Sequence, residues 1–372
     1  MPRLAMSFVL SCLFLPSAAW PGLGAGGADV PYHAALVASA PEDLENTILL
    51  EEENEGVPAP WPSELEDPIL LEDPALQAEG RLRLNIGSGI SKSQIGEYRK
   101  KARDNPGDYK AQYNLGVVYA ATGQYEAAVP PLQEAIRLKP DDAASHNYLG
   151  LVYSSLRRFG DAIDYSKKAL KLAPTMLEPR INLVISYEQL GLHQQMLKPL
   201  QEVVERLPEN AYYQSLLGWL NYQLGNPKAA VQPLQEAIRL GSENPRDHRY
   251  LGEAFLALEQ YEWAIQPLRK AILMAPGLPE PLYNLGTAYA NLDRCLEALH
   301  PLKQAIEIQP EFAEAHGNLG ACYHKQGRYK EARAEYEKAL ALDPKLSEVE
   351  DNLKVLLGKS IDTVDLTPLP EP

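Results

Sequence analysis

Residues 113–140 read YNLGVVYAATGQYEAAVPPLQEAIRLKP, and closely similar text returns along the chain. Its opening recurs as NYLGLVY, SLLGWLNY, YNLGTAY and GNLGACY, each followed by an alanine and another EAIRL-like run. The pattern repeats every 34 residues, with a glycine at Gly116, Gly150, Gly218, Gly252, Gly286 and Gly320 and a valine at Val184. Residues 109–346 therefore hold seven copies without an insertion.

The residues that the copies share fit one face of a helix. A leucine precedes each glycine position, an aromatic residue follows it by three in six copies, and alanines follow by twelve and by nineteen. Leucine, glycine and an aromatic residue at offsets 0, 1 and 4 lie on the same helix face. Because glycine has no side chain and alanine only a methyl group, a second helix can approach this face closely.

Each copy also carries residues that end and begin helices. Gly123, Gly191, Gly225 and Gly327 are placed to end a first helix, in the left-handed conformation that glycine adopts there. Asn226 and Pro227 fit the cap and first turn of a second helix. A proline then closes six copies, at Pro140, Pro174, Pro208, Pro276, Pro310 and Pro344. Each copy is predicted to be a helical hairpin that buries its apolar face only by stacking on its neighbours.

The chain resembles tetratricopeptide repeat (TPR) proteins in the 34-residue length, the Leu-Gly-x-x-Tyr pattern, the two alanines and the closing proline. The resemblance covers residues 109–346 and is specific for the fold but not for the function. It implies an all-α solenoid, a right-handed superhelix of helical hairpins. It also implies that the first helices line a concave groove that binds peptides or partner helices.

The segments on either side of the seven copies fit an array with capped ends. Residues 91–108 resemble the second helix of an incomplete leading repeat, with Tyr98 and Pro106 in register. Residues 347–358 resemble a final capping helix, with Leu353 in the leucine place. Such caps give a repeat array a polar outer surface. Residues 359–372 are expected to be a disordered tail.

The acidity of the chain belongs to one segment. The net charge is −15, yet no Lys or Arg lies between Leu4 and Gly80, whereas residues 81–372 are nearly neutral. Residues 29–90 contain the acidic cluster and several prolines, and we expect a mostly disordered linker there. Two alternatives stay open for its similar pieces TILLEEENE and PILLEDPAL: an irregular cap on the repeats, or docking in the groove. Nothing in the chain is basic enough to predict a nucleic-acid partner.

The first residues have the layout of a secretory signal peptide. Arg3 precedes an apolar run from Leu4 to Leu15, and small residues follow. The run is shorter than the ~20 residues that span a bilayer. Residues 1–28 are therefore predicted to be a cleaved signal, so the mature protein would be exported to the periplasm or the extracellular space without a transmembrane span. A lipid anchor at Cys12 is the less favoured alternative, because the preceding VLS fits a lipoprotein signal poorly.

No catalytic or metal-binding constellation stands out in the sequence. His146, His248 and His316 share one repeat position but belong to copies that are not neighbours, so we expect no metal, cofactor or catalytic site. Cys295 and Cys322 are placed toward the same end of adjacent helices. Two independent buried thiols are favoured over a disulfide, which stays open.

The groove that the resemblance implies carries its largest side chains in copies four to six. The second, fifth, ninth, twelfth and thirteenth residues of each repeat face the groove in this family. They give the predicted partner-binding residues Tyr212, Trp219, Tyr222, Arg246, Arg249, Glu253, Glu280 and Tyr283. Copies one and two have mostly small residues there. Arg246 and Arg249 are spaced to share one partner carboxylate. Alternatively, Trp219 and Tyr222 pack between copies.

Two departures from the regular pattern carry structural predictions. Five copies have a proline inside the second helix, at Pro131, Pro199, Pro233, Pro267 and Pro301. We expect continuous helices that bend there, or simply a tolerated inherited residue. Copy three has Val184, Met196 and Val203 at places that are small elsewhere, which predicts wider helix spacing near residues 177–208, unless the side chains simply repack.

These features favour a non-enzymatic interaction scaffold or assembly factor of the cell envelope. The alternative is an accessory subunit of an envelope enzyme such as a glycosyltransferase or peptidase. A co-chaperone that clamps a C-terminal carboxylate is a third possibility. It would use Asn114, Asn182, Asn284 and Asn318, but the lysines that such a clamp needs are absent.

Overall fold

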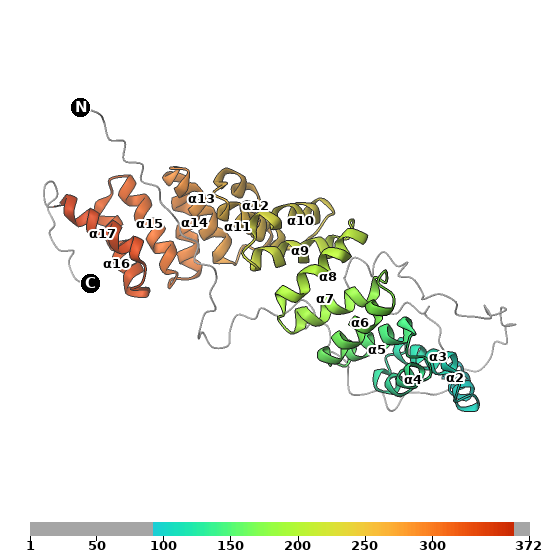
Figure 1. Cartoon of the computed structure of the whole chain (residues 1–372). Coiled ribbons are helices and arrows are strands. Elements are labelled where there is room, and N and C mark those ends of the chain that lie inside the picture. Colours follow the sequence, from blue (N-terminus) through green and yellow to red (C-terminus); the bar gives the residue numbers. More distant parts are fainter. Residues whose placement is uncertain (1–91, 361–372) are drawn as a thin grey trace, which may run out of the picture. The chain divides into compact units, whose positions relative to one another are not determined.

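The computed structural model describes residues 92–360, which form sixteen helices and no strand (Figure 1). The helices are α2 (Lys92–Asp104), α3 (Tyr109–Ala121), α4 (Tyr125–Leu138), α5 (Ala143–Ser155), α6 (Phe159–Leu172), α7 (Glu178–Gln189), α8 (His193–Arg206), α9 (Ala211–Gln223), α10 (Pro227–Arg239), α11 (Pro245–Ala257), α12 (Tyr261–Met274), α13 (Pro279–Asn291), α14 (Cys295–Ile308), α15 (Ala313–Lys325), α16 (Tyr329–Leu342) and α17 (Ser347–Ser360). The prediction of an all-helical repeat fold is confirmed.

The seven copies are seven antiparallel helix pairs, from α3 and α4 to α15 and α16. Helix α2 lies in the expected leading segment, and α17 runs two residues past the expected cap. The predicted signal peptide, the acidic linker and residues 361–372 of the tail lie outside the described residues. None of the described helices is long and apolar enough to cross a membrane.

The close approach of the two helices in a pair depends on the shared glycine. A Cβ atom added at Gly116 would lie 2.5 Å from Cγ of Leu132, and one at Gly218 would lie 2.4 Å from Cγ of Leu234. Both leucines are completely buried, as are the alanines four residues before and three residues after Leu132. The shared residues are therefore the interface within each pair, as the spacing predicts.

Copy three packs more loosely. Val184 fills the glycine place and is buried together with Met196 and Val203. Fewer residues of α7 and α8 approach each other closely than in the other six helix pairs. The larger side chains thus hold this pair apart, in the direction that the sequence predicts.

The five interior prolines lie within helices that continue on both sides of them. Helix α10, for example, runs from Pro227 to Arg239 through Pro233. The prediction of continuous second helices is confirmed, while the bend expected at these residues stays a prediction.

The turn after each first helix requires a left-handed residue in all seven copies. Four copies have a glycine there, with φ between 65° and 74° at Gly123, Gly191, Gly225 and Gly327. The other three have Arg157, Glu259 and Asp293, each with a φ of 58°. A side chain with a Cβ atom is strained in this region by roughly 1–2 kcal/mol. The repeat geometry therefore imposes the turn even where the residue does not favour it.

We expect Arg157→Gly to raise the free energy of unfolding by about 0.5–1 kcal/mol. The gain from relieved strain exceeds the added flexibility of the unfolded chain. Urea denaturation of both proteins measures the change. The reverse substitution in copy four, Gly225→Ala, should lower stability by a similar amount, and an unchanged midpoint for both would contradict this account of the turn.

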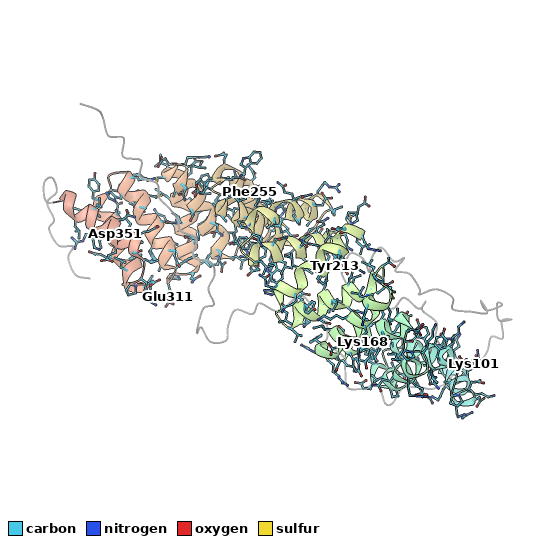
Figure 2. All side chains as sticks on the ribbon, in the orientation of Figure 1. Lys101, Lys168, Tyr213, Phe255, Glu311 and Asp351 are labelled. Atoms are coloured by element: carbon cyan, nitrogen blue, oxygen red, sulfur yellow. The ribbon has the colours of Figure 1, made fainter. Side chains whose placement is uncertain are left out.

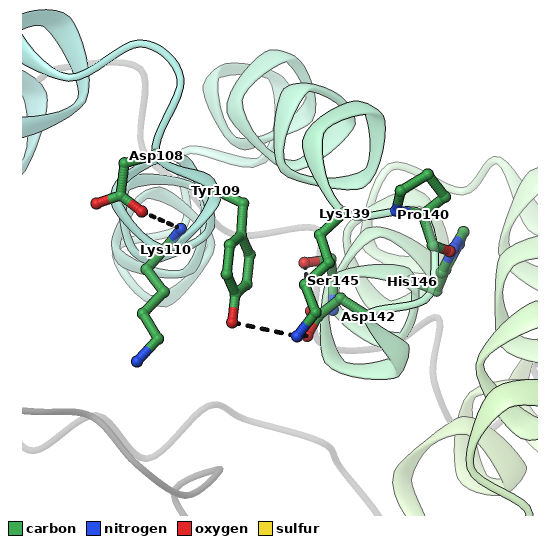
Figure 3. A network of polar contacts seen from close by, with 8 residues as sticks. All are labelled: Asp108, Tyr109, Lys110, Lys139, Pro140, Asp142, Ser145 and His146. Carbon is green, nitrogen blue, oxygen red and sulfur yellow. Dashed lines mark hydrogen bonds and ion pairs between the residues drawn. The ribbon is translucent and has the colours of Figure 1, made fainter.

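The junctions between copies are held by a repeated hydrogen bond. Nε2 of His146 lies 2.9 Å from the carbonyl oxygen of Pro140 (Figure 3). Nε2 of His316 lies 3.0 Å from the carbonyl oxygen of Pro310. The amide of Gln214 donates to the carbonyl oxygen of Pro208 in the same way. The fourth residue of a copy thus fixes the turn that ends the previous copy. This accounts for His146 and His316 but not for His248, and no group of His, Cys, Asp and Glu among the described residues could hold a metal ion.

Acidic caps begin the first helices of copies one and two. Asp108 accepts a hydrogen bond from the backbone N–H of Lys110, and Asp142 accepts one from that of Ser145 (Figure 3). Nζ of Lys139, at the end of α4, lies 3.3 Å from the hydroxyl of Tyr109 at the start of α3. The cap and this contact fix how the two helices of a copy meet.

Candidate inner face of helices α9, α11 and α13

The predicted partner-binding residues lie on three neighbouring first helices. Helix α9 contacts α11, and α11 contacts α13, whereas no two consecutive second helices of the described chain make comparable contact. The first helices therefore line the more crowded, inner side of this part of the stack. We use "inner face" for the surface formed there by Tyr212, Trp219, Tyr222, Arg246, Arg249, Glu253, Glu280 and Tyr283.

A buried carboxylate organises the middle of the inner face. The exposed fraction of Glu253 is 7%, and its Oε1 lies 3.0 Å from Nη1 of Arg249 and 3.1 Å from Nδ2 of Asn284. The hydroxyl of Tyr222 is hydrogen-bonded to the same side chain. One acid thus joins α9, α11 and α13. Burial raises the pKa of Glu253 above its ordinary value, and the adjacent Arg249 opposes that rise.

Two sequence-based expectations need correction here. Glu253 is not an exposed partner contact, because its carboxylate is enclosed by donors from three helices. Arg249 already holds a carboxylate four residues ahead on its own helix, so it is not placed to share a partner's carboxylate with Arg246. Both side chains hold neighbouring residues of the inner face in place through hydrogen bonds.

The aromatic residues of the inner face are half-buried. The Trp219 ring stands edge-on to His193 at 5.1 Å between ring centroids and packs against buried residues on both sides of copy four. Tyr222 lies 5.5 Å from Tyr250, and Tyr283 lies 4.7 Å from Phe312. The alternative that Trp219 and Tyr222 pack between copies therefore holds, although both keep part of their surface exposed.

Solvent reaches the inner face most freely at its charged ends. Arg246 and Glu280 are exposed, and Tyr212 and Tyr283 are half-buried. Figure 2 shows the dense side chains of this region, between the labelled Tyr213 on α9 and Phe255 on α11. The structure thus offers aromatic surface with an arginine and a glutamate beside it.

Several polar contacts between copies were missed at the sequence level. Asn318 donates to Oγ1 of Thr287, as Asn284 does to Glu253, so the sixth residue of one copy bonds the ninth residue of the copy before. Asn182 donates to Asn147. The sequence signal that could have predicted the Asn284 and Asn318 contacts is a polar residue 31 positions before each asparagine. These asparagines bind neighbouring copies instead of forming a carboxylate clamp.

Two more buried acids lie on first helices. Asp247 accepts hydrogen bonds at 2.5 Å from the hydroxyls of Ser215 and Ser242, and burial raises its pKa despite them. Burial also raises the pKa of Glu188 to about 7. Asp247 thus joins α9, through Ser215, to the turn before its own helix.

The two cysteines are buried neighbours. Cys295 begins α14, Cys322 lies on α15, and both thiols are free. They are hydrogen-bonded to each other, which lowers the pKa of Cys295 and raises that of Cys322. The two thiols are therefore in contact and not independent, and the disulfide alternative stays open.

Family models match more than half of the chain. A model described as tetratricopeptide repeat matches residues 183–245 and 283–347, and another with that description matches residues 143–176. A third, described as TPR repeat, matches residues 116–156. No curated protein matches the chain.

Several solved structures are similar to the chain at low sequence identity. The MamA protein is 21% identical, with a TM-score of 0.42, over 52% of this chain and 98% of its own. YrrB, described as a TPR protein with an unusual peptide-binding site, is 20% identical, with a TM-score of 0.33, over 60% of this chain and 97% of its own. A tetratricopeptide repeat protein from Parabacteroides merdae is 16% identical, with a TM-score of 0.39, over 67% of this chain and 98% of its own.

Proposed function

The chain belongs to the tetratricopeptide repeat family, and from that premise we propose that it is a non-catalytic scaffold that binds a protein partner on its inner face. The observation that carries the proposal is the contrast between copies. Copies four to six present half-buried tyrosines and a tryptophan beside exposed Arg246 and Glu280. Copies one and two have Ala120, Ala144 and Ser154 at equivalent places. Aromatic residues and arginine are enriched where binding energy concentrates.

The network around Glu253 supports binding because it fixes the geometry of the face. The carboxylate fastens Tyr222, Arg249 and Asn284 from three helices, so these side chains are already ordered before a partner arrives. A surface ordered in advance loses less conformational entropy on binding. The partner that suits it is an extended peptide or a helix with apolar side chains between charged ones.

We expect Tyr212→Ala and Arg246→Ala each to weaken partner binding by about 30-fold, which corresponds to roughly 2 kcal/mol. Peptides selected from a random display library on the full chain serve as probes, and fluorescence anisotropy measures their affinity. The control is Lys110→Ala, at the same repeat position as both in copy one, which should bind like wild type. Equal binding by all three variants would mean that the inner face is not the binding surface.

The site of action that we propose is the cell envelope. The support is the signal-peptide layout of residues 1–28 together with an interaction fold. N-terminal analysis of the chain recovered from an exporting host should find a new terminus near residues 25–29. An intact Met1 in the cytoplasmic fraction would rule out the envelope, and a lipid-modified Cys12 would replace cleavage there with membrane anchoring.

A further inference from the structure

The outer side of α12 differs from the outer sides of its sister helices. Trp263 is 70% exposed and Leu273 is 78% exposed, although both are large apolar residues. Trp263, Gln266, Lys270 and Leu273 follow each other at steps of three, four and three residues, so they fall within about 80° of the helix circumference. All four are exposed. We call this stripe the α12 outer face.

The chain contains its own reference for this face. Helix α10 has the same buried framework, with Ala230, Leu234 and Ala237 where α12 has Ala264, Leu268 and Ala271, and all six are at most 1% exposed. On its outer side, however, α10 has Ala229, Gln232, Glu236 and Arg239. The two copies therefore differ at solvent-exposed positions while keeping the same core. Trp263 keeps one ring contact, 6.4 Å between centroids from Phe255 of α11, but the packing of the repeats leaves most of its surface and that of Leu273 exposed.

The exchange also removes an ion pair and leaves basic charge. In α10, Nη2 of Arg239 lies 2.5 Å from Oε1 of Glu236, and α4 has the same pair in Arg137 and Glu134. In α12 the corresponding residues are Leu273 and Lys270. Neither Lys270 nor its neighbour Arg269 forms an ion pair with any residue that the structure describes. Lys270 lies close enough to His248 on α11 to affect its pKa. Burial lowers the pKa of His248, and the ammonium group of Lys270 lowers it further.

The next second helix also exposes an apolar residue. Leu296 on α14 is 77% exposed at a repeat place where the other copies have Glu, Gly, Gln or Lys. Arg294 forms an ion pair with Glu262 across the two copies at 3.2 Å. Glu262 adjoins Trp263 and Arg294 is two residues from Leu296, so the two apolar residues flank this pair. The surface therefore combines apolar contacts with unpaired positive charge, which suits an acidic, apolar segment.

The chain itself carries such a segment. Residues 48–52 read ILLEE and residues 69–73 read ILLED, within a stretch of 77 residues that has no Lys or Arg. A fully extended chain covers ~3.3 Å per residue, so 19 residues from Asp73 to Lys92 span up to roughly 60 Å. Five repeat steps separate α2 from α12, so the motif at residues 69–73 comes to α12 on a nearly extended linker.

We propose that the motif ILLED at residues 69–73 docks on the α12 outer face of the same molecule. Its leucines contact Trp263, Leu273 and Leu296, and its carboxylates face Lys270 and Arg269. The contact lies on the opposite side of the helix pairs from the inner face, so it leaves partner binding there possible. This proposal places the acidic linker on the outer side of the repeats instead of in the groove, because the basic residues that complement its charge lie on the outer side.

The test uses the full chain with both motifs disabled by serine at Ile48, Leu49, Leu50, Ile69, Leu70 and Leu71. A fluorescent peptide of residues 64–76 should bind this chain saturably and should bind wild type at least tenfold more weakly, because the wild-type motif occupies the site. Binding to the disabled chain should weaken at least tenfold in Lys270→Glu/Leu273→Arg, which recreates the α10 pair. Lys228→Glu on α10 is the matched charge control and should bind unchanged.

Three outcomes would overturn the proposal. No binding to the disabled chain would remove the site, and equal binding to wild type would show that the face is empty in the intact protein. Concentration-dependent dimers of wild type that Lys270→Glu/Leu273→Arg abolishes would place the motif on a second copy instead. Circular dichroism verifies that each variant keeps its helices, and α10 shows that the introduced Glu–Arg pair is compatible with this helix framework.

Discussion

Replacing Gly252 by valine should lower the free energy of unfolding by about 2 kcal/mol. A Cβ atom at this position would lie 2.5 Å from Cγ and 2.6 Å from Cδ2 of Leu268, which is completely buried. Overpacking a core of this kind costs roughly 1–3 kcal/mol. Because each repeat is stabilised only by its neighbours, the loss should appear as earlier melting of copies four to six.

The matched control is Gly160→Val on α6, where a Cβ atom would meet nothing within 4 Å. Valine favours the helix more than glycine does, so Gly160→Val should be as stable as wild type or slightly more stable. Thermal unfolding of both variants by circular dichroism measures the difference. Equal melting temperatures for Gly252→Val and wild type would show that the glycine does not set the helix spacing. We expect a lower melting temperature instead. Copy three has Val184 at this repeat position, and its two helices approach each other less closely than those of the other copies.

Replacing Arg249 by alanine should cost about 2–3 kcal/mol of stability at pH 8. Removing one partner of a buried pair costs roughly 3–5 kcal/mol, and the 22% exposure of the Arg249 side chain reduces that figure. Arg246→Ala, three residues earlier on the same helix and exposed, should change stability by less than about 0.5 kcal/mol. Urea denaturation compares the two variants.

The loss in Arg249→Ala should shrink at pH 5. The pKa of Glu253 is already raised in the folded protein, and removing Arg249 raises it further. A raised pKa in the folded state means that the carboxyl group is tolerated while protonated and destabilises as the pH rises through that pKa. Adding Glu253→Gln should therefore recover part of the loss at pH 8. A defect of equal size at both pH values, unaffected by Glu253→Gln, would contradict the buried-pair account.

The sequence pattern predicted the helix pairs because one requirement repeats 34 residues apart. A small residue is needed where the two helices of a pair pack closely. Gly218 and Ala230 are such residues, and their types can be read directly from the sequence. The left-handed turns were predicted where the sequence has a glycine. The turn at Arg157 could not be predicted in this way, because the geometry of the repeat imposes a conformation that arginine does not favour.

The candidate site was predicted less well, because charge alone does not reveal burial. Glu253 occupies a groove position of the family pattern, yet donors from two neighbouring copies enclose it. Asn284 lies 31 residues away in the sequence, so the contact becomes visible only when neighbouring copies are aligned by their packing. Trp219 packs against residues on both sides of copy four, as one of the two alternatives predicts, and its role as a partner contact stays a prediction.

Site-specific photo-crosslinking tests the central claim most directly. A photoreactive phenylalanine analogue replaces Tyr212 or Tyr283 on the inner face, or Gln232 on the outer side of α10 as a control. The full chain is irradiated in envelope extract, and mass spectrometry identifies the joined segments. We predict one recurring partner segment joined at both tyrosine positions and absent from Gln232. Crosslinks only from Gln232, or the same products from all three positions, would contradict partner binding on the inner face.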